Sequence, residues 1–203
     1  CDPDVELLDV DNPDTMGAWD FTDYYFEHKR QQTEALNNAM EIIERVSEEY
    51  AELSGRPQPI IDSYGMDDAD YAIIVLSSTA GTARSVVRDL RDRGMKVGVL
   101  KPRVYRPFPA EYIVDAIKDC EAVAVLDRSI SFGTFQGMGP LFEDVTSALF
   151  TEGVSDLNII NYIYGLGGRD TTPPMLESVY DDLQNVAEEG AGGEVIRYLG
   201  LRE

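Results

Sequence analysis

The residues best able to bind a ligand or a partner are arginines and glycines that follow apolar runs. The segment 122–139 (AVAVLDRSISFGTFQGMG) passes from an apolar run into Arg128 and Ser129, then into a loop that contains Phe132 and Gly133. Its glycines read G-x-x-x-G-x-G, which is not the fingerprint that cradles a dinucleotide pyrophosphate. In an open α/β sheet, a loop after a strand is a place for meeting a ligand or partner. We therefore predict a contact surface here, without a specified cofactor.

Two other segments also place arginines beside prolines or glycines after an apolar run. The segment 101–109 (KPRVYRPFP) holds Arg103 and Arg106 among three prolines, which lowers the ordering entropy lost on binding. The segment 164–170 (YGLGGRD) ends in Arg169 and Asp170 after three glycines. Each of these arginines could reach into an interface or form an ion pair inside its own domain.

A turn of small hydroxylated residues, SSTAGT at 77–82, is the other candidate for ligand binding. Hydroxyls and backbone N–H groups at a helix start can hold an anion. The turn lacks the lysine and spaced glycines of a P-loop, and such turns also serve simply as helix caps. An independent nucleotide-binding or coenzyme A-binding module is accordingly an alternative function.

The side chains do not form a recognisable catalytic set. His28 is the only histidine, and Cys1 and Cys120 show neither metal-ligand spacing nor a disulfide framework. We assign no catalytic, cofactor-binding or metal-ligating residue and expect the chain alone to be inactive. The cysteine usage is typical of the reducing cytoplasm.

The elements that must position these residues alternate along the chain. Apolar periodicity predicts strands at 71–77, 97–100, 122–127 and 157–164, and helices at 82–93, 110–118, 140–150 and 173–186. This alternation predicts an α/β fold with an open parallel sheet of about four to five strands and helices on both faces.

Charge is concentrated in the first third of the chain. The net charge is −21, and residues 1–70 hold 19 acidic and 4 basic side chains. Such a surface repels a phosphate backbone, and no apolar run is long enough for a membrane span. We therefore predict a protein that binds neither nucleic acid nor membrane.

A long helix is predicted before the α/β domain. Within 33–54, apolar residues recur at alternating spacings of three and four: Leu36, Ala39, Ile43, Val46, Tyr50 and Leu53. This narrow stripe can pack on its own domain or on another chain. We expect a linker from a missing upstream domain at 1–22, a long connecting helix at 23–56 and the α/β domain at 57–203.

Four segments together resemble one enzyme family. The strings YYFEHKRQQTEALNNAMEII, RPFP, LDRS and GLGGRD, in this order, are similar to the carboxyl-terminal half of the alpha subunit of pyruvate:ferredoxin oxidoreductases. The resemblance implies a transketolase carboxyl-terminal-like domain of an enzyme that converts pyruvate, coenzyme A and oxidised ferredoxin to acetyl-CoA, CO2 and reduced ferredoxin. Relatives acting on 2-oxoisovalerate or 2-oxoglutarate share much of the pattern, so they remain alternatives.

The resemblance also implies partners and cofactors. The complex would use thiamine diphosphate, magnesium, iron–sulfur clusters and coenzyme A, held mainly by other domains or subunits. The partners would be an upstream pyrimidine-binding domain, beta, gamma and delta subunits and, through the complex, ferredoxin. This chain would position domains and close subunit interfaces. The candidate interface residues are Arg103, Arg106, Arg128, Ser129, Phe132, Gly133, Arg169 and Asp170.

Overall fold

The computed structural model describes residues 10, 11, 13, 17 and 19–202. The chain divides into two units, Cys1–Asn38 and Ala39–Glu203. The helix α1 (Tyr25–Ser54) begins in the first unit and ends in the second, and the structure places no residue of α1 in a buried environment. Within the described part of the chain, no helix is both long and apolar enough to cross a membrane.

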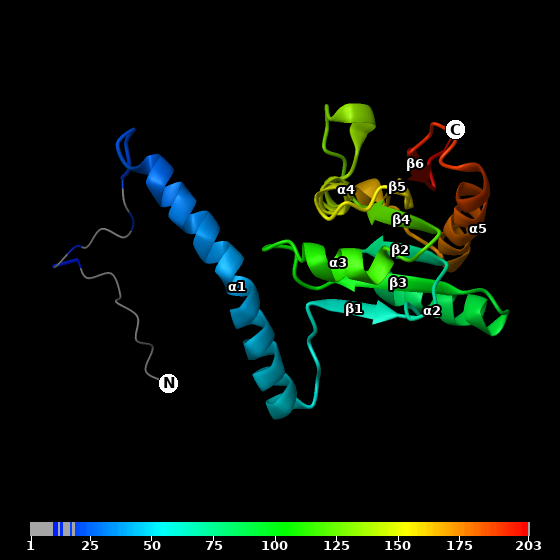
Figure 1. Ribbon diagram of the computed structural model, residues 1–203, viewed down its shortest axis with the longest axis horizontal. Coiled ribbons are helices and arrows are strands. Elements are labelled where there is room, and N and C mark those ends of the chain that lie inside the picture. The colour runs from blue at the N-terminus through cyan, green and yellow to red at the C-terminus, as the bar shows by residue number, and fades with distance from the viewer. Residues whose placement is uncertain (1–9, 12, 14–16, 18, 203) are drawn as a thin grey trace. The chain divides into compact units, whose positions relative to one another are not determined.

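A six-stranded sheet forms the centre of the second unit, in the order β1-β3-β2-β4-β5-β6 (Figure 1). Five strands are parallel, and the edge strand β1 runs antiparallel to β3. The bounds of the strands are β1 Ile61–Tyr64, β2 Tyr71–Val75, β3 Val97–Pro102, β4 Ala122–Asp127, β5 Asn158–Tyr164 and β6 Ile196–Leu199.

Helices cover both faces of the sheet, because its central strands are apolar on both sides. The helices α2 (Thr79–Asp92) and α5 (Pro173–Glu189) pack on one face through a core that includes Ile73, Leu90 and Tyr180. The helices α3 (Ala110–Ile117) and α4 (Pro140–Thr151) pack on the other face around Ile74 and Val145. The predicted α/β class and the two helical layers are confirmed.

The strand count is higher than the four to five predicted. The additional strands β1 and β6 have four residues each and are only partly buried. Edge strands of this length carry no continuous apolar run, so periodicity does not reveal them. The central strand β4 spans Ala122–Asp127 as predicted, and all six of its residues are buried.

Candidate functional site

The candidate interface residues lie after the carboxyl ends of β3, β4 and β5. These strands are parallel, so their carboxyl ends share one edge of the sheet. Arg103 and Arg106 follow β3, which β2 separates from β4. Arg128 and Arg169 follow β4 and β5, which are direct neighbours. The predicted set is thus distributed over two places along this edge.

Both arginines after β3 have partners within the domain. Arg103 donates to the side-chain oxygen of Gln58 and lies 3.8 Å from the Asp62 carboxylate. Arg106 forms an ion pair of 2.9 Å with Asp144 on α4. Its guanidinium also lies 4.1 Å from the ring centroid of Tyr105. These contacts fix the segment 101–109 to its own domain.

The Tyr105 hydroxyl completes this group by donating to Asp144 over 2.8 Å. Burial and the Asp144 carboxylate together raise the pKa of Tyr105. The pKa of Arg106 is also raised: burial is the largest single effect and lowers it, but the hydrogen bond to Asp144, the Asp144 charge and the contacts with Tyr105 together outweigh burial. Both side chains therefore keep their protons at neutral pH, and the cluster is electrostatically satisfied.

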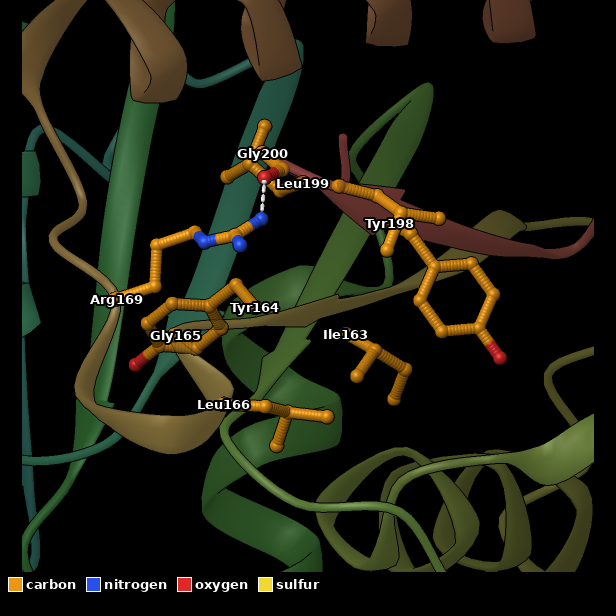
Figure 2. A pocket seen from close by; sticks show the side chains of 9 residues that line it. Ile163, Tyr164, Gly165, Leu166, Arg169, Tyr198, Leu199 and Gly200 are labelled. Carbon is orange, nitrogen blue, oxygen red and sulfur yellow. Dashed lines mark hydrogen bonds between the residues drawn. The ribbon is translucent and has the colours of Figure 1, made fainter. Parts of the chain in front are cut away.

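The arginines after β4 and β5 bind backbone carbonyls. The Arg128 Nε donates to the Gly165 carbonyl over 3.1 Å, joining the loop after β4 to the turn after β5. Arg169 donates to the Gly200 carbonyl beside a shallow pocket of about 160 Å³ that Tyr164 and Tyr198 also line (Figure 2). Asp170, the neighbour of Arg169, is exposed.

The loop after β4 is uncharged and presents aromatic side chains to solvent. The ten residues 129–138 (SISFGTFQGM) carry no charge, although the whole chain has a net charge of −21. Phe132 is 99% exposed and Phe135 is 74% exposed, and Ser129 and Gly133 are exposed beside them. Figure 1 shows this loop extending away from the sheet between β4 and α4. We call residues 128–139 the β4–α4 loop.

A buried polar network holds both ends of this loop. Asp127 is 4% exposed, and its carboxylate accepts hydrogen bonds from the backbone N–H groups of Leu141 (2.9 Å) and Phe142 (3.1 Å). Asn161 on β5 donates to the same carboxylate over 3.0 Å, and its amide oxygen accepts the Gly139 N–H over 2.8 Å. The carboxylate therefore caps α4, while Asn161 fixes the last residue of the loop.

Burial raises the pKa of Asp127, and the three hydrogen bonds that it accepts oppose the shift. Gly139 packs so closely that an added Cβ would lie 2.1 Å from the Asp127 Cγ. Only glycine fits there without displacing the carboxylate. The network thus forms a rigid base beneath an exposed, uncharged loop.

The turn at 77–82 is occupied by contacts of its own chain. Thr79 accepts a hydrogen bond of 3.0 Å from the Tyr164 hydroxyl, and Gly81 donates its N–H to the Ser78 carbonyl. Helix α2 begins at Thr79, and the Ser78 side chain makes no capping hydrogen bond. Nothing in this geometry favours a phosphate over ordinary packing.

The family resemblance implies magnesium and iron–sulfur clusters, which need ligands such as carboxylates and thiolates. Within residues 10, 11, 13, 17 and 19–202, no three His, Cys, Asp or Glu side chains form a group able to hold a metal ion. Cys120 is half-buried, and burial raises the pKa of its thiol to about 11. The described side chains therefore form no group that fits a magnesium or iron–sulfur site.

The sequence matches the family model described as "Pyruvate:ferredoxin oxidoreductase core domain II" over residues 69–176. The chain belongs to this family. All eight candidate interface residues fall inside the matched range, as does the β4–α4 loop.

Curated relatives extend the match over almost the whole chain. The chain is 41% identical to pyruvate synthase subunit PorA of Thermotoga maritima over 99% of its own length and 50% of the relative. It is 35% identical to PorA of Methanothermobacter thermautotrophicus over 97% and 48% of the two proteins. Ketoisovalerate oxidoreductase subunit VorA of Pyrococcus abyssi is also 35% identical, over 98% and 50%. The chain spans about half the length of the curated relatives it matches.

Sequence reasoning missed three residues of this region. Phe135 adds a second exposed ring to the loop, and its apolar character in an uncharged stretch was a usable signal. The sequence also held a signal for Asp127, because a carboxylate that ends an otherwise apolar strand is a candidate for burial. It held no signal for Asn161, which lies 34 residues from Asp127 and meets it only through the pairing of β4 with β5.

Proposed function

We propose that this chain is the carboxyl-terminal part of an alpha subunit of pyruvate:ferredoxin oxidoreductase. The 41% identity to a pyruvate synthase subunit over 99% of the chain carries this proposal. The reaction is pyruvate plus coenzyme A and oxidised ferredoxin to acetyl-CoA, CO2 and reduced ferredoxin. The complex would act in the cytoplasm.

The chain's own role is to position domains and to join subunits. Its partners would be an upstream pyrimidine-binding domain and the beta, gamma and delta subunits, with ferredoxin reached through the complex. Thiamine diphosphate, magnesium, iron–sulfur clusters and coenzyme A would be held mainly on those other parts. The proposed division of the chain is a linker at 1–22, a connecting helix at 23–56 and the α/β domain at 57–203.

The β4–α4 loop is the best candidate for the contact with another subunit. A few residues provide most of the binding energy of a protein interface, and aromatic residues, including phenylalanine, are enriched in interface cores. Phe132 and Phe135 stand on a base that the buried Asp127 and Asn161 hold in place, so little ordering is needed on docking. Arg128 and Arg169 flank the loop at the ends of β4 and β5.

Purification of the native complex through a tag on this chain tests the assignment. The complex should reduce ferredoxin with pyruvate and coenzyme A, and mass spectrometry should identify the co-purifying subunits. Omission of coenzyme A is the control, and it should remove the pyruvate-dependent reduction. A complex that is inert with pyruvate and every other 2-oxoacid would contradict the proposal.

A branched 2-oxoacid is the second candidate substrate, because the VorA relative is 35% identical over 98% of the chain. The same preparation distinguishes the two candidates when it is assayed with pyruvate, 2-oxoisovalerate and 2-oxoglutarate in parallel. We expect the highest kcat/KM with pyruvate. A higher value with 2-oxoisovalerate would reassign the substrate while leaving the family unchanged.

A further inference from the structure

The basic side chains of this acidic chain are concentrated in one stretch. Residues 84–106 hold eight basic and two acidic side chains, although the net charge of the whole chain is −21. Several of the eight donate hydrogen bonds to a carboxylate of their own domain, as Arg91 does to Asp68 and Arg93 to Glu177. The cations without such a bond are the ones that keep donors for an anion from solution.

Arg84 and Lys101 are two such cations. Within the part of the chain that the structure describes, neither side chain forms a hydrogen bond. The Asp62 carboxylate lies 3.7 Å from the Arg84 guanidinium, which is longer than the about 2.7–3.2 Å of an N–H···O hydrogen bond. Both cations therefore keep their N–H donors available.

The sheet and α2 bring these two cations to one pocket. Val99 on β3 lies in the core beneath α2, and Lys101 follows it by two residues, so both side chains project from the same face of the sheet. Arg84 lies on α2 itself. The two cations line a pocket of about 130 Å³, which is also lined by Asp62, Ser63, Tyr64, Ala80, Gly81 and Val99.

The β1 strand holds Arg84 at this pocket. The Arg84 guanidinium lies 4.8 Å from the ring centroid of Tyr64, and the side chain remains 51% exposed. The Asp62 carboxylate is shared between Arg84 and Arg103, which lies 3.8 Å away, and Asp62 pairs with Lys101 across the two strands. One carboxylate thus accompanies three cations, so these four side chains sum to a charge of +2.

We propose that this pocket binds the phosphate group of a small phosphorylated molecule, held by Arg84 and Lys101. A guanidinium donates paired N–H bonds to phosphate oxygens, and an ammonium adds a compact charge. A dianion matches the local charge of +2. The volume is well below the roughly 300–1,000 Å³ of a site that encloses a drug-sized ligand, so the pocket holds the phosphate while the rest of the molecule lies outside.

The charge of the whole chain favours a small ligand over a polyanion. A nucleic acid would extend beyond the pocket and meet the carboxylates that give the chain its net charge of −21. A single phosphate group responds mainly to charges within a Debye length of about 8 Å at physiological salt. The local excess of cations therefore decides its binding.

NMR titration of the isotope-labelled chain with inorganic phosphate tests the site, with chloride at equal ionic strength as the reference. The backbone amide signals of Ser63 and Gly81 should shift and saturate with a Kd below about 10 mM. Arg84→Gln and Lys101→Gln should each weaken binding at least about tenfold, because each removes a charge-assisted contact. The matched control Arg88→Gln removes a cation that pairs with Asp89, outside the pocket, and should change the Kd less than about twofold.

A steric variant tests the same pocket without changing its charge. Gly81 precedes Arg84 by three residues on α2, so a side chain at position 81 would lie beside Arg84. A Cβ added at Gly81 meets no atom within 4 Å, so Gly81→Leu should leave the fold intact and remove saturable phosphate binding. Urea denaturation should show no loss of stability, because leucine is the better helix former.

Three results would overturn the site. The first is a chain whose signals do not saturate with phosphate up to about 50 mM, including a chain that uses Arg84 only to bind an acidic protein. The second is an equal loss of binding in Arg88→Gln, and the third is unchanged binding in Gly81→Leu. None of them bears on the oxidoreductase assignment, which rests on sequence identity.

Discussion

The segments after β3 and β4 look alike in sequence and differ in the folded protein. Both follow buried strands and contain arginine and phenylalanine. In 101–109 the cations are bound within the domain, by Gln58 and Asp62 for Arg103 and by Asp144 for Arg106. In the β4–α4 loop the central ten residues are uncharged, and the phenylalanines point into solvent.

This difference shows that conspicuous charge is a poor guide to an interface. An arginine that already binds a carboxylate of its own domain has fewer free donors and less unbalanced charge to offer a partner. An exposed ring on a fixed base loses only water when a partner covers it. We therefore propose that the β4–α4 loop acts in assembly and that the segment 101–109 stabilises its own domain.

The largest expected effect comes from removing the base of the loop. Asp127→Ala deprives the N–H groups of Leu141 and Phe142 of their acceptor. It also removes one of the two acceptors of the Asn161 amide, which keeps the Val125 carbonyl. Each buried N–H donor that is left without an acceptor costs about 1–3 kcal/mol if the structure around it does not rearrange. The free energy of unfolding should therefore fall by about 4 kcal/mol. Urea denaturation measures this loss. The control Asp115→Ala removes a solvent-exposed partner of Lys118 and should change stability by less than about 0.5 kcal/mol.

The paired variant Phe132→Ser/Phe135→Ser separates assembly from stability. It should weaken association with the other subunits by roughly a hundredfold, because buried aromatic anchors contribute 1–3 kcal/mol each. Unfolding in urea should be unchanged, since both rings are exposed in the chain. Phe150→Ser is the matched control: this ring is 86% exposed at the far end of α4 and should not affect association. Equal losses from Phe150→Ser would refute a specific role for the loop.

Arg106→Ala should lower the stability of the domain and leave subunit association nearly unchanged, which is the reverse of the result expected for Phe132→Ser/Phe135→Ser. The change in free energy should also be smaller. It removes a partly exposed ion pair with Asp144 and the stacking on Tyr105. The free energy of unfolding should fall by about 1 kcal/mol, while subunit association stays within about twofold. Surface plasmon resonance with the remaining subunits provides the association measurement. A strong loss of association without a loss of stability would place the interface at 101–109 instead.

The smallest effect is a pH dependence that originates at Asp127. Its pKa is raised by burial, so the folded state holds the proton more tightly than the unfolded state. The stabilising contribution of the protonated group is therefore lost as pH rises from the ordinary value of 3.8 through the raised pKa. The difference in unfolding free energy between the wild type and Asp127→Asn should fall across that window. A difference that grows with pH would show that the hydrogen bonds outweigh burial.

The sequence predicted the interior of the fold better than its edges. The four central strands are apolar on both sides, and periodicity placed β4 at its observed bounds. The edge strands β1 and β6 were missed because four half-buried residues resemble a loop. The arginines of the candidate site were visible, but Asp144 lies 38 residues from Arg106 and reaches it only after α4 packs on the sheet. Contacts between residues so far apart in the sequence depend on the tertiary fold, so the local sequence does not reveal them.

We propose that the β4–α4 loop, and not the segment 101–109, contacts another subunit. Hydrogen–deuterium exchange of this chain, alone and within the assembled oxidoreductase, tests it most directly. We expect assembly to slow exchange in peptides covering 128–139 and to leave exchange in peptides covering 101–109 unchanged. Protection of 101–109 with no change at 128–139 would contradict it.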